Sequence, residues 1–126
     1  MGQFKMKRVY EPAGESDGYR VLVDRLWPRG MTRERIGMDI WLKEVAPGSE
    51  LIRWFGHRTE RFEEFRVRYI EELNSETVQP HISRLLEWAN VHDVTLLYSA
   101  KDEQYNQAIV LKHYLEERRG RLHGEQ

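Results

Sequence analysis

Two short apolar runs, each ending abruptly in charged and hydroxyl side chains, constrain the fold of this 126-residue chain most. The first is VLV at 21–23, within YRVLVDRL, and the second is VTLLYSA at 94–100. Their length and their β-branched or apolar content predict buried strands. The segment FKMKRVY at 4–10 alternates apolar and basic side chains, which predicts a third, half-buried strand.

Helical patterns fill the chain between and after these strands. We expect short helices at 38–46 and 49–55, and longer helices at 59–74 and 78–89. A last helix is expected over 102–120, with an acidic first turn and a basic last turn. Since parallel strands need helical crossovers, this order predicts an α/β fold: a small layered domain with a short, mainly parallel sheet flanked by helices.

The composition narrows the class of protein. Length and composition predict a single domain spanning residues 1–126, with a tail at about 120–126 that frays. The net charge of −1 draws the chain neither to nucleic acid nor to anionic lipid. The absence of cysteine excludes disulfides, thiolate nucleophiles and Cys-based zinc sites. No segment resembles a signal peptide or a membrane helix, so we expect a cytoplasmic protein with no membrane partner.

The polar side chains that follow the two apolar runs form the candidate site. They are Asp24, Arg25, Arg29, Ser99, Lys101 and Asp102. In open α/β sheets, ligands bind in the crevice beyond the carboxyl ends of the strands. If the two runs are parallel, neighbouring strands, all six side chains lie on one rim.

These residue types indicate recognition of a small anionic ligand. Arg25 and Arg29 carry planar guanidinium groups that match carboxylate or phosphate, and Lys101 adds a compact charge at the start of a predicted helix. Asp24 or Asp102 could orient a bound group or act as a general base, so the sequence leaves open whether the protein is an enzyme. The five histidines show no metal-ligand spacing, and no metal or cofactor is expected.

More ordinary roles for the same residues compete with a binding site. Ser99 and Asp102 are common N-cap residues, and Asp24 can form a salt bridge with a neighbouring arginine. The stretch from Arg20 to Arg35 holds five arginines against two acidic residues. A nucleic-acid-binding or transcription-regulatory module is therefore the alternative function. A non-catalytic partner-binding domain is a third, for which an exposed tryptophan patch would be the sign.

Three segments together resemble a known family. They are DGYRVLVDRLWPRG at 17–30, WLKEVAPGSELIRWF at 41–55 and TLLYSAKDEQYNQA at 95–108. In this order they are similar to the DUF488 family, in its short bacterial YeaO-like branch. The resemblance covers nearly the whole chain and implies the same fold and site location. It implies no reaction, because the family is a domain of unknown function.

The last of these segments departs from the longer members of the family, which carry a motif like C-A-E-K-D-P-x-x-C-H-R there. Lys101 and Asp102 match that motif. Tyr98 and Asn106 stand in place of its cysteines, and Gln107 replaces its histidine. Chemistry that depends on a thiol or an imidazole therefore does not carry over, which favours an anion-binding pocket over nucleophilic catalysis. We include Asn106 among the expected binding residues.

Overall fold

The computed structural model describes residues 1–124 and contains a four-stranded sheet in which every pairing is parallel. The strands are β1 (Phe4–Arg8), β2 (Tyr19–Leu22), β3 (Ile40–Trp41) and β4 (Val94–Tyr98), in the spatial order β1-β4-β2-β3. Val21 pairs with Leu96 and Leu22 with Leu97, so the two apolar runs are neighbours. The predicted parallel α/β sheet is confirmed, and the carboxyl ends of β2 and β4 meet at one edge of it.

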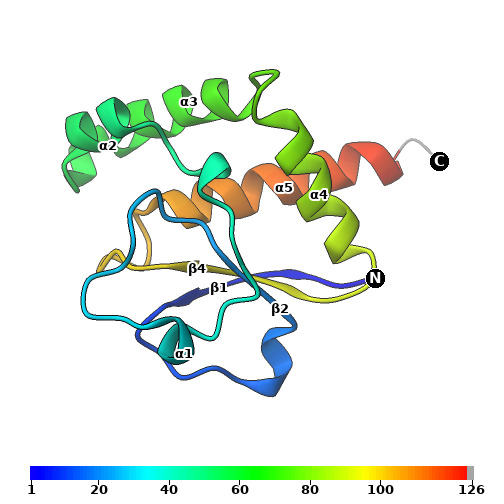
Figure 1. Ribbon diagram of the computed structural model, residues 1–126. Helices are drawn as coiled ribbons and strands as arrows, with labels where there is room; N and C mark the ends of the chain where they lie inside the picture. Colours follow the sequence, from blue (N-terminus) through cyan, green and yellow to red (C-terminus); the bar gives the residue numbers. More distant parts are fainter. Residues whose placement is uncertain (125–126) are drawn as a thin grey trace.

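Helices lie on both faces of the sheet (Figure 1). They are α1 (Arg33–Ile36), α2 (Ser49–Phe55), α3 (Phe62–Leu73), α4 (Gln79–Ala89) and α5 (Gln107–Gly124), with 3-10 turns at Glu15–Asp17, Lys43–Val45 and Thr59–Arg61. Helices α2 to α5 lie on one side and α1 on the other (Figure 1). Because side chains of a strand alternate between faces, Val21 and Leu96 join the large core under α2 to α5. Leu22 and Leu97 pack with Ile36 of α1 in a smaller core.

The prediction of a helix at 38–46 is wrong. This segment forms β3 and the turn Lys43–Val45 instead. Ile40 pairs with Val21 in the parallel ladder, and the indole N–H of Trp41 donates to the carbonyl of Asp24 at 2.7 Å. Pairing with a strand distant in sequence outweighs the weak local preference for helix, and no local pattern reports such a partner.

The last helix begins later than expected. Helix α5 starts at Gln107 rather than near Asp102, so its first turn holds no acidic residue. Asn106 precedes it, is buried, and accepts a hydrogen bond from the backbone N–H of Ile109 at 2.9 Å through Oδ1. Asn106 is therefore the N-cap, and the sequence-based interpretation of Ser99 and Asp102 as caps is wrong.

The same helix continues to Gly124, past the expected end near Gly120. Residues 125–126, the last of the tail that we expected to fray, lie outside the described residues. None of the helices in the described part of the chain has both the length and the apolar character needed to cross a membrane.

Candidate functional site

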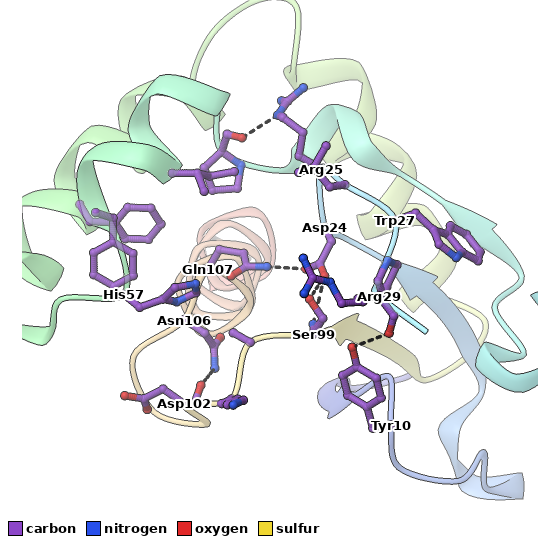
Figure 2. Close-up of a pocket in the computed structure, with 18 residues that line it drawn as sticks. Tyr10, Asp24, Arg25, Trp27, Arg29, His57, Ser99, Asp102, Asn106 and Gln107 are labelled. Atoms are coloured by element: carbon purple, nitrogen blue, oxygen red, sulfur yellow. Dashed lines mark hydrogen bonds between the residues drawn. The ribbon is translucent and has the colours of Figure 1, made fainter. Parts of the chain in front are cut away.

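A cavity of about 680 Å³ lies at the carboxyl ends of β2 and β4 (Figure 2). The loops that follow β2 and β4 supply much of its lining, together with residues of α2. All of the residues that the sequence suggested as a site line this one cavity: Asp24, Arg25, Arg29, Ser99, Lys101, Asp102 and Asn106. The parallel pairing of β2 with β4 explains their meeting, since it brings both loops to the same edge of the sheet.

Asp24 is the most deeply buried acidic group of the cavity, with 6% of its surface exposed. Its Oδ2 accepts hydrogen bonds from the backbone N–H and the hydroxyl of Ser99, at 3.0 and 2.6 Å. Its Oδ1 accepts one from Nε2 of Gln107 at 2.5 Å. Burial raises the pKa of Asp24, and the hydrogen bonds from Ser99 and Gln107 offset part of the rise. These donors are neutral and no ion pair within residues 1–124 includes Asp24, so the salt-bridge interpretation is wrong.

Arg25 holds two parts of the cavity wall together. Its Nε donates to the carbonyl of Pro47 at 2.7 Å, and its Nη2 donates to the carbonyl of Ala46 at 3.1 Å. Figure 2 shows its guanidinium turned toward this wall. The bonds attach the loop after β2 to the segment that enters α2, and Nη1 has no hydrogen bond to another of residues 1–124.

Arg29 and Lys101 are the uncommitted cations of the cavity. Both are exposed, and neither charged group has a hydrogen bond or ion pair to another of residues 1–124. The backbone near Arg29 is nevertheless fixed. Its carbonyl accepts a hydrogen bond from the hydroxyl of Tyr10 at 3.1 Å, and the indole N–H of Trp27 donates to the carbonyl of Met31 at 2.8 Å.

Asp102 shapes the loop between β4 and α5. Its Oδ1 accepts from the backbone N–H groups of Gln104 and Tyr105, at 2.9 and 3.0 Å. Hydrogen bonds from Tyr105 and Gln104, with a smaller effect from the charge of His57, hold the pKa of Asp102 below its usual range. A carboxylate with a lowered pKa is a weak base, so this environment suits a structural role better than general-base catalysis.

Polar residues at or beside the cavity that sequence reasoning missed include Gln107, His57 and Arg8. Gln107 donates to Asp24, and its role depends on where α5 begins. His57 lines the cavity with a φ of 59°, after the left-handed Gly56 that ends α2. Arg8, at the end of β1, donates to the carbonyls of two residues in the loop after β4. Of these three residues, only Arg8 had an indication in the sequence, since it lies near the end of a predicted strand. The positions of Gln107 and His57 depend on where helices begin and end, which the sequence did not define.

The rest of the cavity lining is largely apolar and aromatic. It includes Trp27, Ile52, Phe55 and Phe65. Phe55 and Phe65 are buried and stacked, with ring centroids 4.4 Å apart. An apolar wall beside a few polar groups is typical of small-molecule sites, where the polar groups determine orientation.

The basic stretch between Arg20 and Arg35 does not present a single cationic face. Arg20 is buried, pairs with Asp17, and also donates to the carbonyls of Ile36 and Gly37. Arg35, in α1, donates to the carbonyl of Gly30 in the preceding loop. The described structure thus gives no observation that favours a nucleic-acid interface over the cavity.

The parallel sheet and the cavity define an α/β protein with a pocket at the sheet edge where open α/β sheets commonly bind ligands. The chain belongs to the DUF488 family: residues 3–126 match the family described as the inactive DUF488-N3 subclade. The resemblance stated from the three sequence segments is therefore confirmed.

Three bacterial proteins that the chain resembles are described as uncharacterized. The chain is 44% identical over 109 residues to the uncharacterized protein YeaO of Escherichia coli, which covers 86% of this chain and 93% of YeaO. It is 43% identical over 91 residues to uncharacterized proteins of Mycobacterium bovis (Mb3100c) and Mycobacterium tuberculosis (Rv3073c), covering 72% of this chain and 77% of each relative. No significant match to a solved structure was found.

Proposed function

We propose that the cavity binds a small anionic ligand, such as a phosphate, nucleotide or carboxylate, and that Arg29 and Lys101 neutralise its charge. The observation that supports this proposal is that both cations line one cavity and have no polar partner within residues 1–124. Cations beside apolar walls attract anions strongly, because the walls lower the local dielectric constant.

Binding without catalysis is the form of this proposal that the site supports best. Both oxygens of Asp24 are occupied by protein donors, and Asp102 has a lowered pKa. Neither carboxylate is therefore well suited to remove a proton from a ligand. The description of the matching family as inactive agrees with this inference.

Substitution of the two free cations tests the proposal. Inorganic phosphate and adenosine monophosphate should each raise the melting temperature of the wild-type protein, since a ligand at 100 times its Kd adds about 2.7 kcal/mol of stability. Arg29→Ala and Lys101→Ala should each weaken binding by about tenfold or more, because a charge-assisted hydrogen bond is lost. Both side chains are exposed, so the melting temperature without ligand should change little.

Arg58→Ala is the matched control for this experiment. Arg58 is an exposed arginine outside the cavity lining, with only a 4.0 Å contact to Glu60. Its removal lowers the total charge by the same amount as Arg29→Ala but should leave phosphate binding unchanged. The proposal is wrong if neither anion stabilises the wild type, or if Arg58→Ala weakens binding as much as Arg29→Ala does.

A further inference from the structure

On the buried side of the cavity, Asp24 determines which neighbouring groups are left to donate or accept hydrogen bonds. An ionised carboxylate can only accept hydrogen bonds. The two oxygens of Asp24 receive the N–H and the hydroxyl of Ser99 and the amide nitrogen of Gln107. Figure 2 shows that amide nitrogen facing Asp24. The hydroxyl hydrogen of Ser99 and one N–H of Gln107 are thus directed away from any ligand.

The acceptors that remain available to a ligand on this side lie on Gln107 and Ser99, while Nε2 of Gln107 keeps a second N–H that Asp24 does not bind. Once Nε2 of Gln107 faces Asp24, its Oε1 lies on the other side of the planar amide. Oε1 has no hydrogen-bond partner within residues 1–124, and Gln107 lines the cavity. Among the described residues, the only fully buried side-chain nitrogen or oxygen without a partner is Nε of Arg119. Oε1 of Gln107 is therefore accessible, and the lone pairs of the Ser99 hydroxyl are further acceptors.

We propose that the cavity selects ligands that combine an anionic group with an N–H or O–H donor, and that Oε1 of Gln107 accepts the hydrogen bond from that donor. This inference rests on the proposed anion site, since Arg29 and Lys101 bind the anionic group. The aromatic wall formed by Phe55 and Phe65 suits a flat apolar body. The ligand class is an aryl or heteroaryl phosphate or carboxylate that carries an amino or hydroxyl group.

The same geometry predicts that one substitution reverses the preference of the cavity for ligands that carry a hydrogen-bond donor. In Asp24→Asn, the new carbonyl oxygen can still accept from Ser99, but the new amide nitrogen faces Nε2 of Gln107. Two donors cannot bond each other, so the Gln107 amide should rotate and turn Oε1 toward the new amide nitrogen. Its NH₂ group then faces the ligand, and the acceptor becomes a donor. Adding Gln107→Glu to this variant should return an acceptor to the cavity, because a carboxylate can accept on both sides.

Three aryl phosphates test the inference by isothermal titration calorimetry at pH 8, where each is a dianion. They are phenyl phosphate, 4-aminophenyl phosphate with a donor, and 4-nitrophenyl phosphate with acceptors only. The wild type should bind the amino compound about tenfold more tightly than the nitro compound, which is the effect of one hydrogen bond. Asp24→Asn should prefer the nitro compound, and the double variant should again prefer the amino compound. Thermal unfolding of each variant verifies that it is folded.

A further variant keeps the test decisive if Asp24→Asn does not fold. Gln107→Leu removes the acceptor while leaving Asp24 bound to Ser99, so it should bind the amino and nitro compounds equally. Equal binding by the wild type, or an unchanged preference in Gln107→Leu, overturns the inference while leaving the anion site intact. Failure of all three aryl phosphates and of inorganic phosphate to bind the wild type refutes both the anion site and this inference.

Discussion

At the scale of single residues, Asp24 and Asp102 are two carboxylates of one cavity with opposite environments. Burial raises the pKa of Asp24, whereas backbone hydrogen bonds from Tyr105 and Gln104 lower that of Asp102. Both residues follow a strand end in the sequence, where nothing distinguishes them. The difference arises because Asp24 faces the sheet edge and α5, while Asp102 lies in an exposed turn.

This difference predicts two separate titrations. Carboxyl ¹³C NMR should give Asp24 a higher midpoint than Asp102. A carboxyl whose folded pKa is raised stabilises the protein below its unfolded pKa and loses that contribution as pH rises through its folded pKa. The unfolding free energy of the wild type relative to Asp24→Asn should therefore fall over this pH window, by about 1.4 kcal/mol for each unit of pKa difference. Asp102→Asn should show the opposite trend, and equal midpoints for both carboxyls would contradict the assignment.

At the scale of elements, Asn106 joins the loop after β4 to helix α5. Its Oδ1 accepts from the N–H of Ile109, and its Nδ2 donates to the carbonyl of Asp102 at 2.8 Å. The side chain that the sequence suggested as a ligand-binding group thus already has two protein partners. Asn106 therefore caps α5 and also lines the cavity.

Asn106→Ala should lower the unfolding free energy by about 1–2 kcal/mol, because α5 loses its N-cap and the carbonyl of Asp102 loses its donor. Urea denaturation followed by circular dichroism measures this loss. Asn90→Ala is the control, since Asn90 is exposed at the end of α4 and should change stability by less than about 0.5 kcal/mol. Similar values for the two variants would show that the cap contributes nothing.

At the scale of the whole molecule, the sheet is buried on both faces by unequal layers. Helices α2 to α5 cover one face, and the four-residue α1 covers part of the other (Figure 1). The smaller core contains Leu22 and Leu97, both fully buried, so even a short helix completes the burial of two central strands. This burial supports the strand ends from which both cavity loops begin.

Ile36→Ala should therefore destabilise the protein by about 2–5 kcal/mol, the usual range for removing a buried isoleucine side chain. Ile36 is the buried residue of α1 and is fully inaccessible. Chemical denaturation measures the change. Val91→Ala, at a site that is 73% exposed, is the control and should lie within about 0.5 kcal/mol of the wild type. A loss no larger than that of the control would show that the smaller core is dispensable.

The local pattern of apolar and polar residues was sufficient to predict much of the fold and where the candidate site would lie. Val21 and Leu22 of the first apolar run lie in β2, the run at 94–98 is β4, and the polar residues after both strands line one cavity. The helix at 38–46 and the start of α5 could not be predicted in the same way. Ile40 and Trp41 take strand form because β2 offers them a partner, and α5 starts where Asn106 can cap it.

The sequence by itself determined the fold class and the two loops that carry the polar residues, because hydrophobic periodicity and strand-end chemistry are local properties of the chain. The family followed from the resemblance of three sequence segments and from the family match. Only the tertiary structure decided which of those polar groups are already occupied. Arg25 is bonded to the carbonyls of Ala46 and Pro47, and Asp24 to Ser99 and Gln107, while the charged groups of Arg29 and Lys101 have no polar partner within residues 1–124. Hydrogen-bond partners come from segments far apart in the chain, so their pairing becomes defined only when the sheet brings those segments together.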